Sequence, residues 1–158
     1  MGSLTHIMFH CADTPASTPI TEKDILRWHT GPKPQYRGWK KPGYAGIWLL
    51  DGSFKILVPF DEDDQIDSWE ISNGAIGWNG VAKHFCTIGG SGNQDTRTPQ
   101  QLAAQETFCR LALVMWPDVK FIGHNQVNLD KYCPSYSVPQ WCESIGIPFK
   151  NIDYEIYY

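Results

Sequence analysis

The sequence lacks any apolar run of about 18 residues, so no membrane-spanning helix is predicted. Its first residues also lack a basic stretch followed by a long apolar one, and a secretory signal is therefore not expected. Basic residues are few: 13 Lys and Arg stand against 17 Asp and Glu, which gives a net charge of −4. This balance argues against nucleic acid as the main partner.

A disulfide framework is also missing, because the five cysteines are odd in number and irregularly spaced. Most of them are expected to be buried thiols, with Cys133 as the exception. Charged residues make up only 19% of the chain, whereas hydrophobic residues make up 42% and aromatic residues 13%. This composition is typical of a globular chain, and its 158 residues predict one domain with one core.

Local patterns predict strands and helices along the whole chain. Strands are expected at residues 4–10, 44–50, 53–59, 84–88 and 119–122, and helices at residues 21–30, 98–116 and 138–144. The Asp51-Gly52 pair between two strands is the strongest hairpin signal. In the longest helix, Phe108, Leu111, Ala112 and Met115 are expected to form the core stripe.

The segment at residues 119–136 contains the residues best suited to bind a metal or to take part in catalysis. A strand leads to Gly123 and His124, and Cys133 follows nine residues after that histidine, with Lys131 two residues before the cysteine. A neutral imidazole and a thiolate are good zinc ligands. A lysine near a metal can lower a thiol pKa or stabilise an oxyanion. One His and one Cys form a weak signal, so a third ligand is needed.

The third ligand is His10, at the carboxyl end of the first strand, where sites of α/β proteins gather. His6 lies on the same strand face but about 13 Å away, too far to share one metal, and is read as structural. His29 is expected to pack beside Trp28. Three protein ligands would leave a fourth zinc position open for water, which is the catalytic arrangement.

Such a site implies metal-assisted hydrolysis of an amide or ester, with Tyr44 and Lys131 as candidate donors to the oxyanion.

Two other regions allow two interpretations each. Residues 31–43 interleave basic and aromatic side chains, as in sites for anionic or sugar-bearing polymers or in a solvated loop with anchored rings. The acidic run at residues 61–67 lacks the spacing of an EF-hand, so a solvated turn is favoured over calcium binding.

Several short motifs occur in one order along the chain. They are Phe9–Thr14, Gly38–Tyr44, Asp51-Gly52, Gly77–Asn79, Cys86–Gly90, Thr98–Gln101, Gly123-His124 and Lys131–Tyr136. Over about residues 4–146, this ordered set resembles the type 2 N-acetylmuramoyl-L-alanine amidases, which include the amidase-type phage lysozymes and the peptidoglycan recognition proteins. The resemblance implies an α/β domain over residues 1–158, with a mixed central β-sheet flanked by helices and zinc at the end of a peptidoglycan groove.

The resemblance also assigns roles to single residues. It implies that Zn²⁺ is bound by His10, His124 and Cys133. It implies that Tyr44 and Lys131 assist cleavage of the amide between N-acetylmuramic acid and L-alanine. Candidates for substrate contacts are Trp39, Trp78 and Asn79, whose alternative roles are packing rings and a turn residue.

Three positions depart from the family pattern. Ala45 and Gly74 stand where the family often has histidines, and Asn125-Gln126 stands where it often has an acidic residue. These departures concern substrate contacts and support of the site more than the metal ligands. Recognition proteins that only bind muropeptides commonly lack the Cys ligand or the Tyr, and both are present here.

An enzyme is therefore favoured over a non-catalytic muropeptide-binding module of the same fold. A thiol enzyme with Cys133 as its nucleophile is a third, weaker interpretation. We expect peptidoglycan or its muropeptides as the partner, no nucleic acid, no membrane span and a monomer. Without a signal, the chain is expected to be made in the cytoplasm and to act at the bacterial cell wall after release, as a phage lysin does, or after export.

Overall fold

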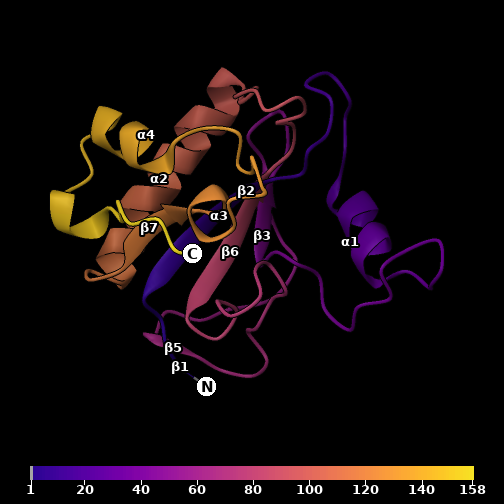
Figure 1. Ribbon diagram of the computed structural model, residues 1–158, viewed down its shortest axis with the longest axis horizontal. Helices are drawn as coiled ribbons and strands as arrows, with labels where there is room; N and C mark the ends of the chain where they lie inside the picture. The colour runs from indigo at the N-terminus through magenta and orange to yellow at the C-terminus, as the bar shows by residue number, and fades with distance from the viewer. Residues whose placement is uncertain (1) are drawn as a thin grey trace.

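The computed structural model describes residues 2–158 and is built around a five-stranded mixed β-sheet with the strand order β4-β3-β6-β2-β7 (Figure 1). Its strands are β2 (His6–Cys11), β3 (Gly46–Trp48), β4 (Phe54–Ile56), β6 (Ala82–Thr87) and β7 (Lys120–Gly123). The four strands β3, β6, β2 and β7 are parallel, and only the edge strand β4 is antiparallel to its neighbour. The expected mixed sheet is confirmed.

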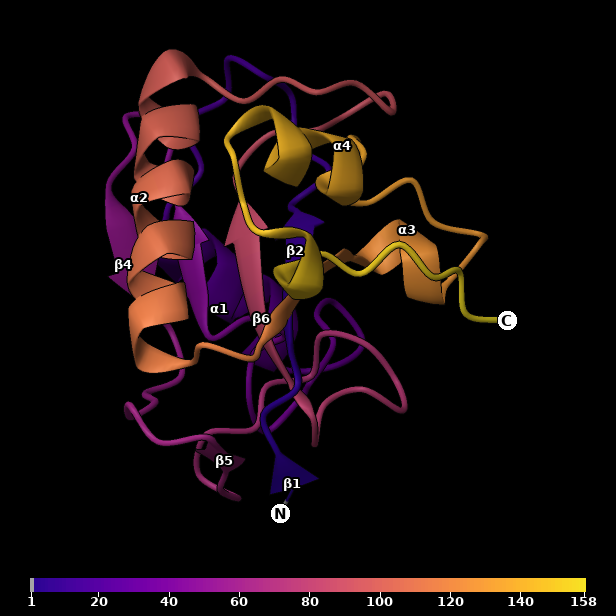
Figure 2. The same ribbon diagram turned by 90° about the vertical axis from the view of Figure 1, so that its left-hand side faces the viewer.

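Helices cover both faces of this sheet. The other elements are β1 (Gly2–Ser3), α1 (Glu22–Thr30), β5 (Gln65–Ile66), α2 (Pro99–Met115), α3 (His124–Val127), α4 (Val138–Ser144) and η1 (Phe149–Asn151). In Figure 2, α2 stands in front of the sheet and α1 behind it. No helix within residues 2–158 is both long enough and apolar enough to cross a bilayer.

Alternation along β2 separates the core from the face that carries the site. Ile7 and Phe9 point toward α2 and α4, where Phe9 stacks on Phe121 of β7 with 5.7 Å between ring centroids. Met8 and His10 therefore point to the opposite face, because successive side chains of a strand alternate. Parallel pairing continues this face across β6 and β7, so side chains distant in sequence meet there.

The starts of α1 and α2 and the turn between β3 and β4 lie where the capping and turn residues of the sequence predict them. Thr98 caps α2 by accepting a hydrogen bond from the Gln101 backbone N–H at 3.0 Å. Asp24 accepts the Thr21 backbone N–H at 3.0 Å and so closes the start of α1. Gly52 has φ +86°, a conformation that suits glycine, in the turn between β3 and β4. These predicted boundaries are confirmed.

The predicted core stripe of α2 is partly wrong, because Leu111 is 57% exposed. The helix instead turns Gln101, Gln105, Cys109 and Ala112 toward the sheet. Gln101 is fully buried because its amide donates to the backbone carbonyls of Trp48 and Ile88, at 3.2 and 2.9 Å. Hydrophobic spacing cannot reveal a helix face that buries glutamines, one of which bonds to the ends of two strands.

Candidate metal centre and cleft

Three predicted ligands converge at the carboxyl end of the parallel strands. His10 lies near the end of β2, His124 is the first residue of α3 directly after β7, and Cys133 lies in the loop before α4. One ligand atom from each of the three lies within 4.8 Å of the other two. The pairing of β2 with β7 brings His10 to His124, and their ring centroids are 4.7 Å apart.

The donor set fits a tetrahedral zinc ion. Usual Zn–N and Zn–S bond lengths imply a nitrogen–sulfur separation of about 3.6 Å across such an ion. The Nδ1 atom of His10 lies 3.6 Å from Sγ of Cys133. Two imidazoles and one thiol leave a fourth position for water or substrate, as catalytic zinc sites do.

The loop that carries Cys133 is held by polar contacts at that residue and just after it. The backbone N–H of Cys11 donates to Cys133 Sγ at 3.2 Å, and the Ser135 hydroxyl donates to the Gly90 carbonyl at 2.8 Å. Gln105 of α2 donates to the Tyr136 hydroxyl at 2.8 Å. The sulfur is therefore placed by strand ends and by α2, and not by its own loop alone.

Burial keeps the histidines of this centre neutral. It lowers the pKa of His124 to about 4, with a further decrease caused by the Lys131 ammonium. The pKa of His10 also lies well below its ordinary value, because of burial and then of His84 and His124. Neutral imidazoles have a free lone pair, so these side chains are ready to bind a metal at neutral pH.

The pKa of the Cys133 thiol is shifted upward, whereas the pKa values of the histidines are shifted downward. Its hydrogen bond with Cys11 and its burial raise the pKa of Cys133 above the ordinary value. Without a metal the thiolate is therefore scarce, which argues against the thiol-nucleophile interpretation. All five cysteines are free, and only Cys133 is not fully buried, as expected.

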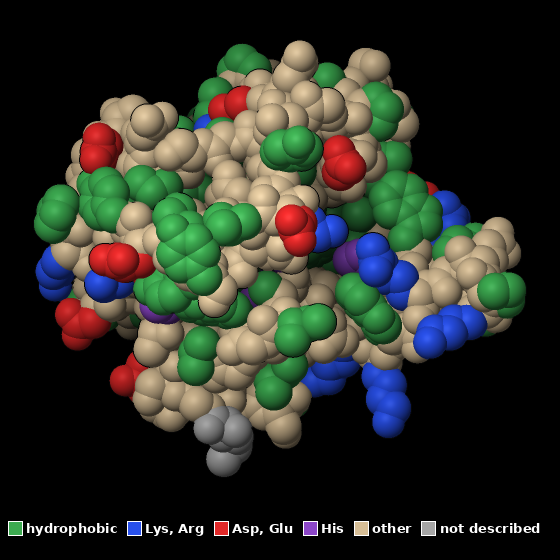
Figure 3. Space-filling view, viewed as in Figure 1, with side chains coloured by type: hydrophobic (Ala, Val, Ile, Leu, Met, Phe, Trp, Pro, Cys, Tyr) green, Lys and Arg blue, Asp and Glu red, His purple; other side chains and the backbone are tan. Residues whose placement is uncertain are grey.

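The centre opens into a cleft of about 710 Å³ that is also lined by Trp39, Tyr44 and Lys131. Figure 3 shows a histidine side chain in a hollow between α3 and α1, beside Lys and Arg side chains and bordered by hydrophobic ones. The Tyr44 ring lies 5.2 Å from the His10 ring. Burial, followed by the neighbouring thiols of Cys86 and Cys133, raises the pKa of Tyr44, so its phenol remains a hydrogen-bond donor.

Trp78 and Asn79 are not among the residues that line this cleft, although Asn79 contacts Ala75, which is one of them. The Trp78 ring packs edge-on against His6 and Tyr157, at 5.1 and 4.9 Å between centroids. The Asn79 side chain accepts the Ala75 backbone N–H at 2.9 Å. His6 also contacts the Asp153 carboxylate at 2.8 Å, which agrees with its expected structural role.

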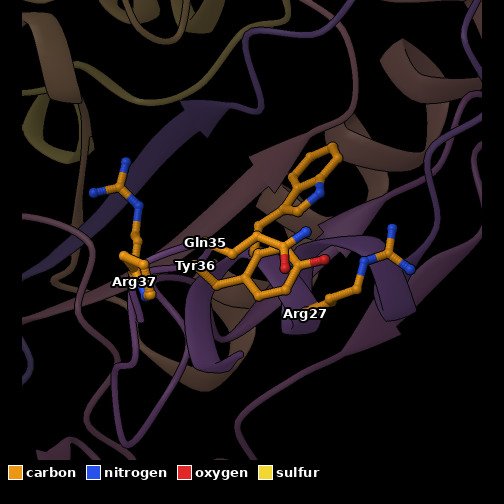
Figure 4. Close-up of a pocket in the computed structure, with 6 residues that line it drawn as sticks. Arg27, Gln35, Tyr36 and Arg37 are labelled. Atoms are coloured by element: carbon orange, nitrogen blue, oxygen red, sulfur yellow. The ribbon is translucent and has the colours of Figure 1, made fainter. Parts of the chain in front are cut away.

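A second, shallower cavity of about 840 Å³ is formed by α1 and the loop after it. In Figure 4, Arg27 and Arg37 lie on opposite sides of Tyr36. Arg37 also lines the main cleft, and its guanidinium lies 4.8 Å from the Trp39 ring centroid. The basic and aromatic loop predicted at residues 31–43 therefore forms one wall of the cleft.

The acidic run does not offer three free carboxylates. Asp61, Asp63 and Glu70 approach one another, but Glu70 is buried against the Lys83 ammonium at 2.8 Å. Its carboxylate also accepts the backbone N–H groups of Asp61 and Asp67. The favoured interpretation as a turn is consistent with these contacts.

His84 is the residue of this centre that the sequence pattern did not reveal. It lies on β6, fully buried, with Nδ1 2.9 Å from Nε2 of His10. Ala45, one of the departures from the family pattern, is buried in the core beside β3. Knowledge of the parallel pairing of β2 and β6 would have identified His84. In that register His84 is the partner of Met8, and its side chain therefore lies on the same face as those of Met8 and His10.

His29 predicts an acid-sensitive contact beside the cleft. Its Nδ1 accepts the Gly43 backbone N–H at 3.0 Å, and burial lowers the pKa of His29 to about 4. The unfolded chain, with a histidine pKa of about 6.5, binds more protons between pH 6.5 and 4. The free energy of unfolding should therefore decrease over this range as the pH falls, by on the order of 2 kcal/mol from this residue.

Urea denaturation of metal-free protein at several pH values measures this loss. The matched variant is His29→Asn, which keeps an acceptor near the Nδ1 position but does not titrate. Its stability should fall less between pH 6.5 and 4 than that of the parent protein. Equal slopes for the two proteins would contradict the assignment.

Comparison with known proteins places this geometry in context. No protein-family model matches the chain. The endolysin of Klebsiella phage KP32 is 26% identical over 143 residues, which cover 88% of this chain and 85% of that protein. The endolysin of Escherichia phage T7 is 26% identical over 141 residues, which cover 87% of this chain and 84% of that protein.

Solved structures of other proteins have the same fold as this chain. The N-acetylmuramoyl-L-alanine amidase LysC from Clostridium intestinale has a TM-score of 0.72 at 19% identity, covering 93% of this chain and 88% of that one. Drosophila PGRP-LB has a TM-score of 0.71 at 21% identity, covering 93% and 84%. The chain therefore has the fold of the N-acetylmuramoyl-L-alanine amidases and peptidoglycan recognition proteins, and its sequence is related to those of phage endolysins.

Proposed function

We propose that this protein is a zinc-dependent amidase that hydrolyses the bond between N-acetylmuramic acid and L-alanine in peptidoglycan. The observation that carries the proposal is the convergence of His10, His124 and Cys133 at the base of an open cleft. The sequence similarity to phage endolysins and the structural similarity to an N-acetylmuramoyl-L-alanine amidase support the substrate class.

The donor chemistry of the three residues supports zinc. His10 and His124 are neutral at physiological pH, and Cys133 supplies a thiolate once its proton is released. When bound in a three-ligand site, zinc supplies Lewis-acid chemistry and lowers the pKa of water to about 7. The requirement that Cys133 lose its proton makes metal affinity rise with pH.

Tyr44 and Lys131 are proposed to stabilise negative charge that develops on the scissile carbonyl oxygen. Tyr44 keeps its O–H because its pKa is raised, and its ring lies beside His10 at the cleft wall. Lys131 is exposed at the cleft edge, and its positive charge already affects His124. A donor held in place before the reaction loses little energy to reorganisation when charge appears.

Trp39 is the proposed contact for the glycan or the stem peptide, because its ring lines the cleft and is only partly buried. An aromatic face offers apolar area without needing a matched charge. Trp78 and Asn79 remain candidates from the resemblance, although their contacts here are with protein groups.

A muropeptide-binding module without catalysis is the competing proposal. A structure of a tyrosine-to-phenylalanine mutant of Drosophila PGRP-LB in complex with tracheal cytotoxin has a TM-score of 0.72 to this chain. Such a module would bind muropeptides saturably and release no new amine. The presence of both Cys133 and Tyr44 in the cleft favours the enzyme.

Metal content tests the proposal directly. Protein purified without chelator or added metal is expected to contain about one zinc per chain by mass spectrometry, because three ligands of suitable type converge. A muropeptide digest should then release peptides with a new L-alanine amine, and a chelator should stop that release. Folded protein with no bound metal, which takes up none when zinc is added, would contradict the proposal.

A further inference from the structure

His84 lies behind the proposed ligand His10 on the same face of the sheet. The side chains come from the neighbouring parallel strands β6 and β2, and His10 Nε2 lies 2.9 Å from His84 Nδ1. The exposed fractions of the two residues are 1% and 0%, so water does not compete for this contact. The contact therefore links a metal ligand to a residue that has no other role in the proposed chemistry.

Only one arrangement of protons in this pair leaves His10 able to bind a metal. The Nδ1 atom of His10 faces Cys133 Sγ, so it must present a lone pair to the metal. The His10 proton then lies on Nε2 and is donated to Nδ1 of His84. In the opposite arrangement His84 is the donor, and the His10 proton lies on Nδ1, where it blocks the metal position.

The contact with His10 is the hydrogen bond that the described structure gives to the His84 ring. If His84 Nδ1 accepts, a neutral His84 carries its proton on Nε2. That atom is buried and has no hydrogen-bond partner among residues 2–158. A buried polar atom without a partner carries a free-energy cost and calls for an explanation. Orientation of His10 by the other nitrogen of the same ring provides one.

Gly74 provides the space that this arrangement needs. A Cβ atom at residue 74 would lie 2.2 Å from Cγ and 2.3 Å from Nδ1 of His84. Such separations are far below van der Waals contact, so any side chain there would displace the ring. The family that this sequence resembles often has a histidine at the position of Gly74. In this chain a glycine stands there, and its neighbour in space is a histidine of β6, His84.

We propose that His84 is a positioning residue that accepts the Nε2 proton of His10 and so fixes the ring for metal binding. The inference rests on the proposed zinc site, and Gly74 belongs to it as the residue that makes room for the ring. Hydrogen-bond partners of metal-bound histidines set the ring orientation, and their loss typically lowers metal affinity about 10–100-fold.

Zinc affinity measured by competition with a chromogenic chelator tests the proposal in four proteins. His84→Leu fills much of the ring volume without an acceptor, and Gly74→Ala displaces the ring without changing its chemistry. Both should bind zinc about 10–100-fold more weakly than the parent protein. His84→Asn keeps an amide oxygen near the Nδ1 position and should retain affinity within about threefold.

A second measurement needs no variant. Nitrogen-15 NMR of the zinc-loaded parent protein should show the His10 proton on Nε2 and none on Nδ1. Binding of zinc to folded His84→Leu as tightly as to the parent protein, or a His10 without an Nε2 proton, would overturn the proposal. If the parent protein binds no zinc, the proposed function itself fails, and the two failures are therefore distinguishable.

Discussion

Replacement of Cys133 with serine is expected to abolish stable zinc binding and to reduce muropeptide hydrolysis by at least about 10³-fold. The physical reason is the loss of the one anionic group among the three proposed ligands, which are two imidazoles and one thiolate. A serine hydroxyl remains protonated at neutral pH and is not among the usual zinc ligands. Mass spectrometry of the purified variant measures the metal, and the release of L-alanine amines measures the activity.

The control for this variant is Cys142→Ala. Cys142 is a fully buried thiol on α4 that packs in the main core, away from the three converging ligands. Its loss should lower thermal stability, because a buried thiol behaves as a small apolar group, but should leave one zinc per chain. A Cys133→Ser protein that keeps its zinc and its activity would remove Cys133 from the site and leave the metal assignment without its third ligand.

Tyr44→Phe is expected to lower kcat by about 10²–10³-fold while zinc content and KM change little. The substitution removes one hydroxyl and keeps the ring that packs beside His10 and His29, at 5.2 and 5.3 Å between centroids. If the hydroxyl acts only on charge that develops during the reaction, its removal raises the barrier by about 2.7–4 kcal/mol without weakening substrate binding.

Steady-state kinetics on a soluble muropeptide separate these two effects. The matched control is Tyr36→Phe, which removes a hydroxyl from the second cavity beside Arg27 and should leave kcat unchanged. Lys131→Ala belongs in the same series, as the other proposed donor at the cleft edge. Unchanged turnover in both Tyr44→Phe and Lys131→Ala would show that the charge is stabilised by other groups.

Much of the local structure follows from short sequence signals. The Asp51-Gly52 turn, the Thr98 cap and the strand that ends at Gly123 depend on residues close together in sequence, and all appear in the structure. Such signals are readable because turns and caps satisfy their own backbone groups locally. The three ligand candidates could also be named from residue type and position at the ends of strands.

The sequence by itself thus determined most of the longer elements, the mixed α/β class and the chemical types of the proposed ligands. Only the tertiary structure decided that His10 lies beside His124, since more than a hundred residues separate them and strand pairing alone brings them together. It also decided that glutamines rather than Leu111 face the sheet, and that His84 occupies the space above Gly74. These contacts depend on which strands are neighbours and which helix face meets them, and periodicity within one segment carries no information about either.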